Sequence, residues 1–304
     1  MDKMQTMKHY WGIDLGGTKI EGVVLDDTYK PLARLRLPTE QEKGYEHIVQ
    51  QIGKVVDLLK QETNLEPTQI GIGTPGAINP KTQLLKNSNT VCLNGKPLHL
   101  DLEKLLNLPV KMANDANCFA LAEAVMGIVP EKVPNARMVF GVIMGTGCGG
   151  GLVIDGKVWN GKHGIGGEWG HNFLDESGGD CYCGKAGCNE RIIAGPGLER
   201  FYFQQTGIKK SLKEIVQLHR NGTDEAATQT MNRLTTFFAK AISVVINILD
   251  PDAIVLGGGV NNINEIITQG IPKINDFIFN DSVETVFLKP KLGDSAGVFG
   301  AALL

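Results

Sequence analysis

Residues 9–25 read HYWGIDLGGTKIEGVVL, two apolar runs separated by a short turn that contains Gly16 and Gly17. The runs at residues 9–13 and 20–25 each predict a β-strand, and a glycine turn between two strands predicts a hairpin. Backbone amides in such a turn offer hydrogen-bond donors to an oxyanion, and glycine lets the anion approach closely. The segment therefore predicts the beginning of a sheet that carries a candidate phosphate-binding turn.

The second half of the chain repeats this plan. Residues 137–144 predict a buried strand, which leads into the glycine-rich run GTGCGGG at 145–151. Residues 152–154 and 157–159 flank an Asp-Gly pair, which is a hairpin signal. Two parts of the chain that each begin with a strand, a glycine turn and a second strand indicate a duplicated fold.

Helical patterns alternate with the strands. Apolar residues recur at helical spacing in residues 45–62 and 227–249, and residues 295–304 predict a helix of small side chains. This alternation is typical of α/β proteins. We expect two domains with a cleft between them: a small one formed by residues 1–114 and 290–304, and a larger one formed by residues 115–289.

The composition argues against a nucleic-acid or membrane surface. The chain has 304 residues and a net charge of −3, so it lacks the excess of positive charge that attracts polyanions. No apolar run reaches the roughly 18 residues that a membrane span needs. The first ten residues, MDKMQTMKHY, lack the apolar region of a secretory signal peptide, so we expect a cytoplasmic protein whose cysteines are reduced.

Two segments match the pattern G-x-G-x-x-G, beginning at Gly71 and at Gly145. In a dinucleotide site this pattern follows a strand and opens a helix. Here the first match runs into Pro80, which cannot open a long helix there, and the second runs into a hairpin. The context therefore argues against a dinucleotide site and favours a clamp for the phosphates of ATP.

Such a clamp needs hydrogen-bond donors and a cation site. In the first glycine turn, the amides and the Thr18 hydroxyl are candidates to hold phosphate oxygens, and Asp14 is a candidate to hold Mg²⁺ through water. The segment Gly145–Gly147 would face this turn from the other half of the chain. Each glycine turn taken alone is equally compatible with an ordinary tight turn, but three of them follow strands, at residues 16–17, 145–151 and 257–259.

A cysteine-rich loop lies within EWGHNFLDESGGDCYCGKAGCNE, residues 168–190. Three cysteines and His171 provide three thiolates and one imidazole, the ligand set of a closed tetrahedral zinc site. The alternative is a set of buried thiols or a disulfide. A disulfide across Cys-x-Cys is strained, and the three remaining cysteines are scattered singly, so we expect a metal.

Two carboxylates, Glu168 and Glu190, bracket the expected metal ligands. Bound zinc would order the loop and thereby fix the positions of both acids, which indicates a binding site built on the loop. Four protein ligands leave no open coordination position, so the zinc is expected to be structural. This ligand set also argues against a zinc hydrolase.

Taken together, these motifs resemble the ROK family of sugar kinases over essentially the whole chain. The residues that carry the resemblance are the Asp14–Lys19 turn, Asn114-Asp115, the run 145–151, Glu168-x-Gly-His171, the three-cysteine loop and Gly257–Gly259. The resemblance implies the two-domain actin-like, ribonuclease-H-like ATPase fold, and phosphoryl transfer from ATP with Mg²⁺ to a hexose. It also implies a homodimer.

Shorter segments refine this resemblance. Residues 87–97, 113–118, 168–172 and 247–252 are most similar to bacterial ROK fructokinases and manno(fructo)kinases, so we expect fructose as the acceptor, with mannose as a second sugar. N-acetylglucosamine kinases are similar too, and they more often carry Phe where this chain has Trp169. An N-acetylglucosamine or glucose kinase of the same family therefore remains the alternative.

The resemblance also assigns residue roles. Asp115 is implied to be the general base that takes the proton from the 6-hydroxyl of the sugar; its alternative role is to cap the helix predicted at 117–126. The residues implied to bind the sugar are Gly76, Asn89, Asn114, Glu168, His171 and Glu190. Those implied to bind Mg·ATP are Asp14, Gly16, Gly17, Thr18, Lys19, Gly145, Thr146, Gly147, Gly257, Gly258 and Gly259. The metal ligands are His171, Cys181, Cys183 and Cys188. Lys19 is equally compatible with a solvated charge.

Two other classes of protein fit the sequence less well. Repressors of the same family carry a DNA-binding domain ahead of the first glycine turn, whereas only thirteen residues precede Asp14 here. A non-catalytic sugar sensor would be expected to lack Asp115 or the phosphate loops, and this chain has both.

Overall fold

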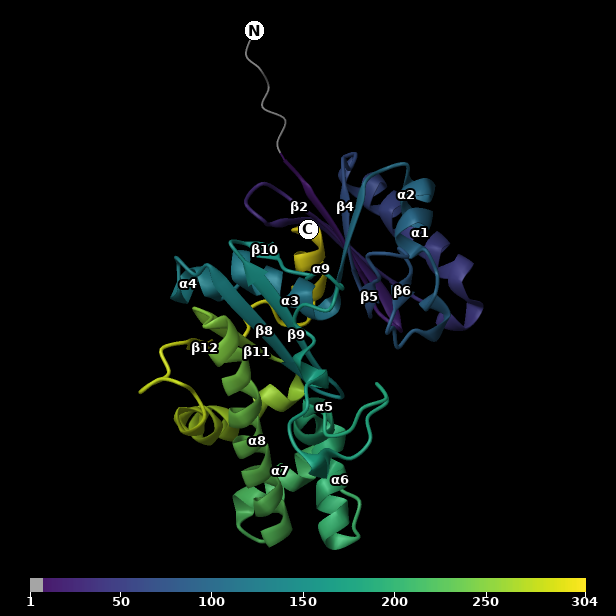
Figure 1. Ribbon diagram of the computed structural model, residues 1–304. Helices are drawn as coiled ribbons and strands as arrows, with labels where there is room; N and C mark the ends of the chain where they lie inside the picture. The colour runs from purple at the N-terminus through teal and green to yellow at the C-terminus, as the bar shows by residue number, and fades with distance from the viewer. Residues whose placement is uncertain (1–7) are drawn as a thin grey trace. The chain divides into compact units, whose positions relative to one another are not determined.

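The computed structural model describes residues 8–304 as a mixed α/β protein (Figure 1). The expectation about a signal peptide falls mostly on residues 1–7, which lie outside the described residues. The strands are β1 (Tyr10–Leu15), β2 (Lys19–Leu25), β3 (Pro31–Pro38), β4 (Ile70–Thr74), β5 (Ala77–Ile78), β6 (Leu85–Lys86), β7 (Val110–Asn114), β8 (Met138–Met144), β9 (Cys148–Ile154), β10 (Lys157–Val158), β11 (Ala253–Gly257) and β12 (Val286–Leu288). The helices are α1 (Tyr45–Thr63), α2 (Leu98–Leu106), α3 (Asp115–Val125), α4 (Val129–Lys132), α5 (Asn189–Ile193), α6 (Gly195–Thr206), α7 (Leu212–Asn221), α8 (Glu225–Leu249) and α9 (Ala296–Ala302).

The two larger sheets have the same plan. Their strand orders are β3-β2-β1-β4-β7 and β10-β9-β8-β11-β12. In the first sheet β1 pairs with β2 in antiparallel register and with β4 in parallel register, and in the second sheet β11 is parallel to both β8 and β12. Both predicted hairpins and the repeated plan are therefore confirmed, and so is the α/β class.

Contacts between residues group the chain into two compact units. The first unit contains Met1–Pro134, Gly151–Gly166 and Lys291–Leu304, and the second contains Asn135–Gly150 and Gly167–Pro290. One of the boundaries along the chain, between Gly150 and Gly151, falls within β9. This grouping assigns α3 to the first unit, because α3 packs against α9 (Figure 1). The domain limits expected from the sequence, at residues 114 and 290, remain a prediction.

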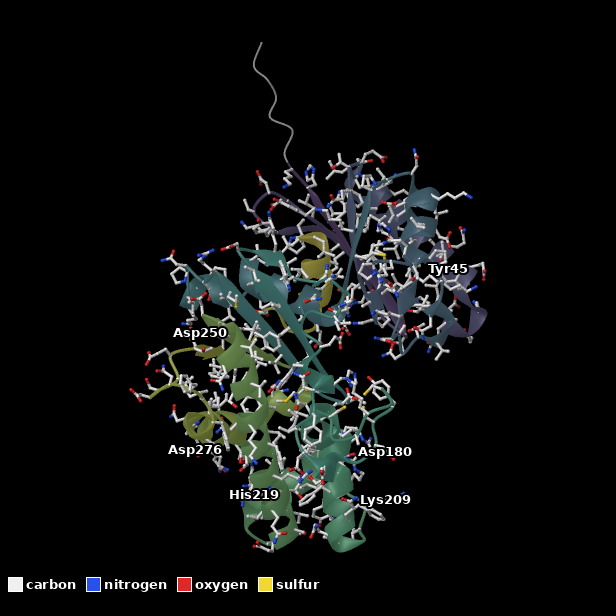
Figure 2. The ribbon with its side chains drawn as sticks, viewed as in Figure 1. Tyr45, Asp180, Lys209, His219, Asp250 and Asp276 are labelled. Carbon is white, nitrogen blue, oxygen red and sulfur yellow. The ribbon has the colours of Figure 1, made fainter. Side chains whose placement is uncertain are left out.

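The core of the first unit forms where the sequence pattern predicts it. The apolar stripe of α1 is buried: Ile48, Ile52, Val55, Val56 and Leu59 are each at most 1% exposed. It packs with residues of β1, β2 and β4. At the beginning of α1, the hydroxyl of Tyr45 (labelled in Figure 2) donates a hydrogen bond of 2.5 Å to Asp101 of α2. Helical spacing thus predicted both α1 and the face that it buries.

The predictions missed the shortest elements. β5 and β6 have two residues each, and β12 has three, which is too short for a period of two to emerge. Among residues 8–304, no helix combines the length and the apolar character needed to cross a bilayer.

Glycines line the contacts between helix α9 and its neighbours α3 and β4, so the backbones approach closely. A Cβ atom at Gly300 would overlap the backbone carbonyl of Cys118 in α3, and one at Gly71 in β4 would overlap the carbonyl of Ala301. These contacts are with backbone atoms, which cannot move aside as the end of a side chain can. The small residues of α9 are therefore required by packing.

We predict that Gly300→Ala destabilises the protein by about 1–3 kcal/mol, because overpacking outweighs the gain of about 1 kcal/mol that alanine gives within a helix. Urea denaturation monitored by circular dichroism measures the change in the free energy of unfolding. The matched control is Gly53→Ala in α1, where the added Cβ meets the end of the Leu105 side chain. Equal stability of the two variants would contradict the packing argument.

Candidate active site and metal centre

Strand β7 and helix α3 meet at the expected catalytic pair. Asn114, the last residue of β7, is the N-cap of α3: its Oδ1 accepts a hydrogen bond of 2.8 Å from the backbone N–H of Asn117. Asp115 is the first residue of the helix, and its Oδ1 accepts from the N–H of Ala116 at 2.8 Å. The alternative role for Asp115, as the helix cap, is therefore wrong. Asn114 is the N-cap of α3, and the carboxylate of Asp115 accepts one hydrogen bond within the first turn.

The first unit gathers negative charge around this helix. Asp115 remains accessible to solvent, yet the protein atoms around its carboxylate desolvate it and raise its pKa. Burial also raises the pKa of Asp14 to about 6, with further contributions from the charges of Asp115 and Glu21, opposed by Lys19 and Arg36. Raised carboxylate pKa values are typical of functional sites. Bound Mg²⁺ would relieve this repulsion, and these side chains therefore suit a cation.

Asp14 lies against the beginning of α9. A Cβ atom at Gly297 would be 2.9 Å from Oδ2 of Asp14, so only glycine leaves room for the carboxylate. On the other strand of the hairpin, Glu21 lies directly opposite Asp14. Glu21 is 1% exposed and is held by Arg34 and Arg36, with 2.8 Å between its Oε2 and Nε of Arg36.

Sequence reasoning missed Glu21 and its two arginines. The signal was present, because residues opposite each other across a hairpin share a face of the sheet. Lys19 lies 3.7 Å from Oε2 of Glu21 and is about half exposed. Lys19 therefore has a carboxylate neighbour within the protein, whether it contacts phosphate or is a solvated charge.

The first glycine turn is held by a residue that the sequence did not single out. The N–H of Gly16 donates to the carbonyl of Lys19 at 2.9 Å, which closes the turn. The hydroxyl of Thr39 donates to the carbonyl of Gly16 at 2.6 Å, and the N–H of Thr39 donates to the carbonyl of Thr18 at 3.0 Å. Thr39, which directly follows β3, thus fixes the turn.

The other two glycine loops meet within the second unit. β8 and β11 are adjacent parallel strands, so the loops that follow them emerge at the same edge of the sheet. A Cβ atom at Gly145 would lie 3.9 Å from the N atom of Gly259, and one at Gly258 would overlap the backbone of Met144. In open α/β sheets, ligands bind at the carboxyl ends of the strands. The structure therefore brings together Gly145–Gly147 and Gly257–Gly259, as a nucleotide site requires.

The four predicted metal ligands converge in the second unit. One ligand atom from each of His171, Cys181, Cys183 and Cys188 lies within 4.8 Å of all the others. Sγ of Cys181 is 3.7 Å from Nδ1 of His171, and Sγ of Cys183 is 3.6 Å from Sγ of Cys188. A tetrahedron with Zn–S bonds of about 2.3 Å has edges of roughly 3.8 Å, so this donor set fits zinc.

A disulfide is not the arrangement seen in the loop. All six cysteines of the chain are free thiols. The separation of 3.6 Å between Cys183 and Cys188 is far longer than an S–S bond of about 2.05 Å. Asp180, labelled in Figure 2, directly precedes the first ligand cysteine.

His171 has a second partner that the sequence did not reveal. Its Nε2 lies 3.1 Å from the hydroxyl of Tyr182, and the two rings meet edge to face at 5.3 Å. A hydrogen bond of this kind orients a ligating imidazole. A sugar hydroxyl that used Nε2 would therefore have to share it with Tyr182, which is 81% exposed.

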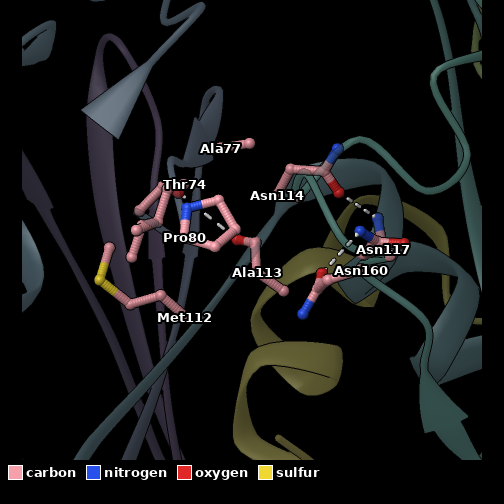
Figure 3. Close-up of a pocket in the computed structure, with 11 residues that line it drawn as sticks. Thr74, Ala77, Pro80, Met112, Ala113, Asn114, Asn117 and Asn160 are labelled. Atoms are coloured by element: carbon pink, nitrogen blue, oxygen red, sulfur yellow. Dashed lines mark hydrogen bonds between the residues drawn. The ribbon is translucent and has the colours of Figure 1, made fainter. Parts of the chain in front are cut away.

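The residues expected to bind the sugar lie in both units. In the first, Gly76 has a φ of 90°, and Asn89 is exposed. Asn114 lines a cavity of about 170 Å³ together with other side chains of the first unit (Figure 3). Beside it, Asn117 donates to Oδ1 of Asn160 at 3.3 Å. Glu168 and Glu190 belong to the second unit, and assembly of all these residues into one site remains a prediction.

Trp169, which served as a cue to the sugar, has a structural role. Its side chain is 3% exposed and packs edge-on against Phe140 at 6.1 Å. Its indole N–H donates to the carbonyl of Gly149 at 2.8 Å. A residue so enclosed is not available to a sugar, so the Trp-for-Phe difference carries little information about the acceptor.

Comparison with known proteins gives one consistent family. The sequence pattern of the ROK family matches residues 10–304. An N-acetyl-D-glucosamine kinase of Vibrio atlanticus is 37% identical over 306 aligned positions, which cover 97% of this chain and 99% of that protein. A ROK hexokinase of Thermus thermophilus has a similar structure, with a TM-score of 0.87 and 29% identity over 97% of each chain.

A second solved structure supports the same conclusion. A ROK family glucokinase of Streptomyces griseus, in complex with glucose and AMPPNP, is 25% identical with a TM-score of 0.74, over 97% of this chain and 98% of that one. The resemblance found in the sequence motifs is therefore confirmed. This chain belongs to the ROK family and has its two-domain actin-like ATPase fold.

Proposed function

We propose that this protein is an ATP-dependent sugar kinase that transfers a phosphoryl group to the 6-hydroxyl of a hexose. The position of Asp115 carries the proposal: a desolvated carboxylate in the first turn of α3, in the same unit as Asp14. Family membership and the paired glycine loops of the second unit support it.

The residue roles follow from the demands of phosphoryl transfer. The transition state is loose, so positioning and neutralisation of charge dominate. Asp115 would accept the proton of the attacking hydroxyl, which contributes about 10²- to 10⁴-fold. Mg²⁺ supplies the charge that neutralises the phosphates, and Asp14 would hold it, through water. The loops at 16–19, 145–147 and 257–259 would bind ATP through their amides.

The sugar would be bound by oxygen and nitrogen acceptors of both units. Carboxylates can each accept from two hydroxyls, which suits Glu168 and Glu190. Asn114 would contribute its amide and His171 its ring edge. Gly76 and Asn89 are the remaining members of the proposed set.

Among hexoses, we propose N-acetylglucosamine as the first acceptor to test. Relatives from several bacteria, at 33–37% identity over nearly their whole length, are N-acetyl-D-glucosamine kinases. Fructose is the second candidate because the segments at residues 87–97, 113–118 and 247–252 resemble fructokinases. The segment at residues 168–172 is left out of this comparison with fructokinases because Trp169 is buried.

The test is ADP release with Mg·ATP against N-acetylglucosamine, fructose, mannose and glucose. We expect one acceptor to exceed the others in kcat/KM by at least about tenfold, because a site that hydrogen-bonds one set of hydroxyls leaves groups unpaired with another. Highest kcat/KM with N-acetylglucosamine supports the first acceptor, and highest kcat/KM with fructose supports the second. Absence of turnover with all four sugars would overturn the proposal and favour a non-catalytic sensor.

Asp115→Asn tests the proposed base. We expect kcat to fall by about 10²- to 10⁴-fold, because the amide cannot accept the proton. Nucleotide affinity should be unchanged. The thermal midpoint at pH 7.5 should be equal to or above that of the wild type, since a carboxylate with a raised pKa in the folded state destabilises the fold above that pKa. Steady-state kinetics and thermal denaturation measure the two effects.

The pH dependence of this difference has a defined sign. Stability contributed by protonated Asp115 is present at low pH and is lost as the pH rises through the raised pKa of the folded state. The two proteins should therefore differ least in acid. A loss of stability in Asp115→Asn at pH 7.5, with kcat near that of the wild type, would contradict the role as a base.

We also propose that His171, Cys181, Cys183 and Cys188 hold a structural zinc ion. The purified protein should contain about one zinc per chain, and Cys183→Ser should lower zinc affinity by at least about tenfold, since a neutral hydroxyl replaces a thiolate. Competition with a chromophoric chelator measures this affinity. Cys92→Ser is the matched control, because Cys92 lies outside the cluster. Equal zinc affinity in both variants would exclude the site.

A homodimer and a cytoplasmic location, both expected from the sequence and the family resemblance, remain parts of this proposal. Sedimentation velocity would measure the first directly.

A further inference from the structure

The turn that follows β8 and the first two residues of β9, together Gly145–Gly149, are here called the phosphate-side loop. It is closed by a hydrogen bond of 2.9 Å from the N–H of Gly145 to the carbonyl of Gly147. Besides the loop at Gly257–Gly259, two short segments of the second unit contact it, residues 169–171 and 188–195. Each segment contains one or more of the proposed zinc ligands: His171 in the first and Cys188 in the second.

Glu190 holds the middle of the phosphate-side loop. Its Oε2 accepts a hydrogen bond of 2.9 Å from the backbone N–H of Cys148. A Cβ atom at Gly147 would lie 2.8 Å from the same oxygen, so the carboxylate lies directly against the loop. Glu190 is two residues from Cys188, in the first turn of α5.

The beginning of α6 holds the start of the loop. The N–H of Gly195 donates to the carbonyl of Gly145 at 2.9 Å. Between Cys188 and Gly195 the chain is short and buried: Ile192, Ile193 and Ala194 are each at most 1% exposed. This stretch therefore connects the metal ligand rigidly to two points of the phosphate-side loop.

The turn Trp169–His171 holds the other end. The indole of Trp169 donates to the carbonyl of Gly149 at 2.8 Å. A Cβ atom at Gly170 would overlap the carbonyl of Cys148, so the two backbones are in direct contact. The side-chain amide of Asn189 donates to the carbonyl of Trp169 at 2.7 Å, and the backbone N–H of Asn189 donates to the carbonyl of Asn172 at 3.0 Å. These two hydrogen bonds join the two segments.

We propose that the zinc loop positions the phosphate-side loop for nucleotide binding, and that Glu190 is the positioning residue that connects them. The inference rests on the proposed kinase function, because it assigns the phosphate-side loop to ATP. It gives Glu190 a task separate from any contact with sugar. It also makes zinc a determinant of nucleotide affinity, although no zinc ligand belongs to the phosphate-side loop.

The physical argument concerns preorganisation. Amides bind phosphate well only when they point at it before binding, since ordering a loop at that moment costs affinity. Without the metal, residues 171–188 lose the constraint that fixes their ends. The supports at Trp169, Glu190 and Gly195 would then fluctuate, and the amides of the phosphate-side loop with them.

Substitutions at Glu190 separate the two tasks. The test measures the Kd of Mg·AMPPNP by calorimetry in the absence of sugar. In Glu190→Gln, an amide oxygen can still accept from Cys148, so the nucleotide Kd should stay within about threefold of the wild type, while sugar affinity falls. In Glu190→Ala, the buried donor loses its acceptor, and the nucleotide Kd should rise by about 5- to 30-fold, the equivalent of roughly 1–2 kcal/mol.

A second variant tests the proposal even if Glu190→Ala fails to fold. Trp169→Phe removes the donor to Gly149 and keeps an aromatic ring against Phe140, and it should raise the nucleotide Kd several-fold. Trp159→Phe, in an exposed position of the first unit, is its matched control and should leave this Kd unchanged. Removal of zinc by a chelator should raise the nucleotide Kd at least as much as Glu190→Ala, and added zinc should restore it.

The outcomes are distinct. An unchanged nucleotide Kd in Glu190→Ala, Trp169→Phe and the zinc-free protein, with weakened sugar binding in the first and last, would overturn the inference and leave the proposed kinase standing. Equal weakening in Glu190→Gln and Glu190→Ala would also overturn it, because charge alone would then explain the effect. A wild-type protein that binds no adenine nucleotide would overturn the proposed function itself.

Discussion

Desolvation of the carboxylates of Asp14 and Asp115 is the constraint on which the candidate site of the first unit depends. Burial raises the pKa of both groups, the charge of Asp115 adds to the effect on Asp14, and burial likewise raises the pKa of the Cys118 thiol, with smaller contributions from the two carboxylates. The fold tolerates this cost because Arg34 and Arg36 neutralise the nearby Glu21. Desolvated carboxylates whose charge is only partly offset are suited to a cation and to proton acceptance.

Hydrogen bonds from neighbouring elements hold the functional loops in place. Thr39 fixes the turn at Gly16, Asn114 caps α3 and so orients Asp115, and Glu190 holds the loop at Cys148. None of these supports belongs to the loop that it fixes. Glycine-rich loops have little conformational preference of their own, so a precise arrangement has to be imposed by such contacts.

The sequence predicted most of the fold, and it singled out residues that the structure brings together, for identifiable physical reasons. Periodicity located α1 and its buried stripe, and ligand chemistry singled out four residues whose potential ligand atoms converge. Supports such as Glu21 and Tyr182 were missed, because their role depends on which strands and loops lie opposite each other. The burial of Trp169, which the sequence used only to compare subfamilies, could not be read from the motif. Acceptor choice depends on small differences in hydrogen bonding that no motif encodes.

The position of α9 has a consequence for the order in which the protein matures. This helix, Ala296–Ala302, contributes Gly297 beside Asp14 and Gly300 beside Cys118, although the strands around it come from the first 114 residues. Domains tend to fold as they leave the ribosome, N-terminal parts first. Here the core that packs against α1 contains no residue of α9, so it can form early. The glycine-lined face of β1 and β4 that α9 covers, in contrast, stays uncovered until almost 300 residues have been synthesised.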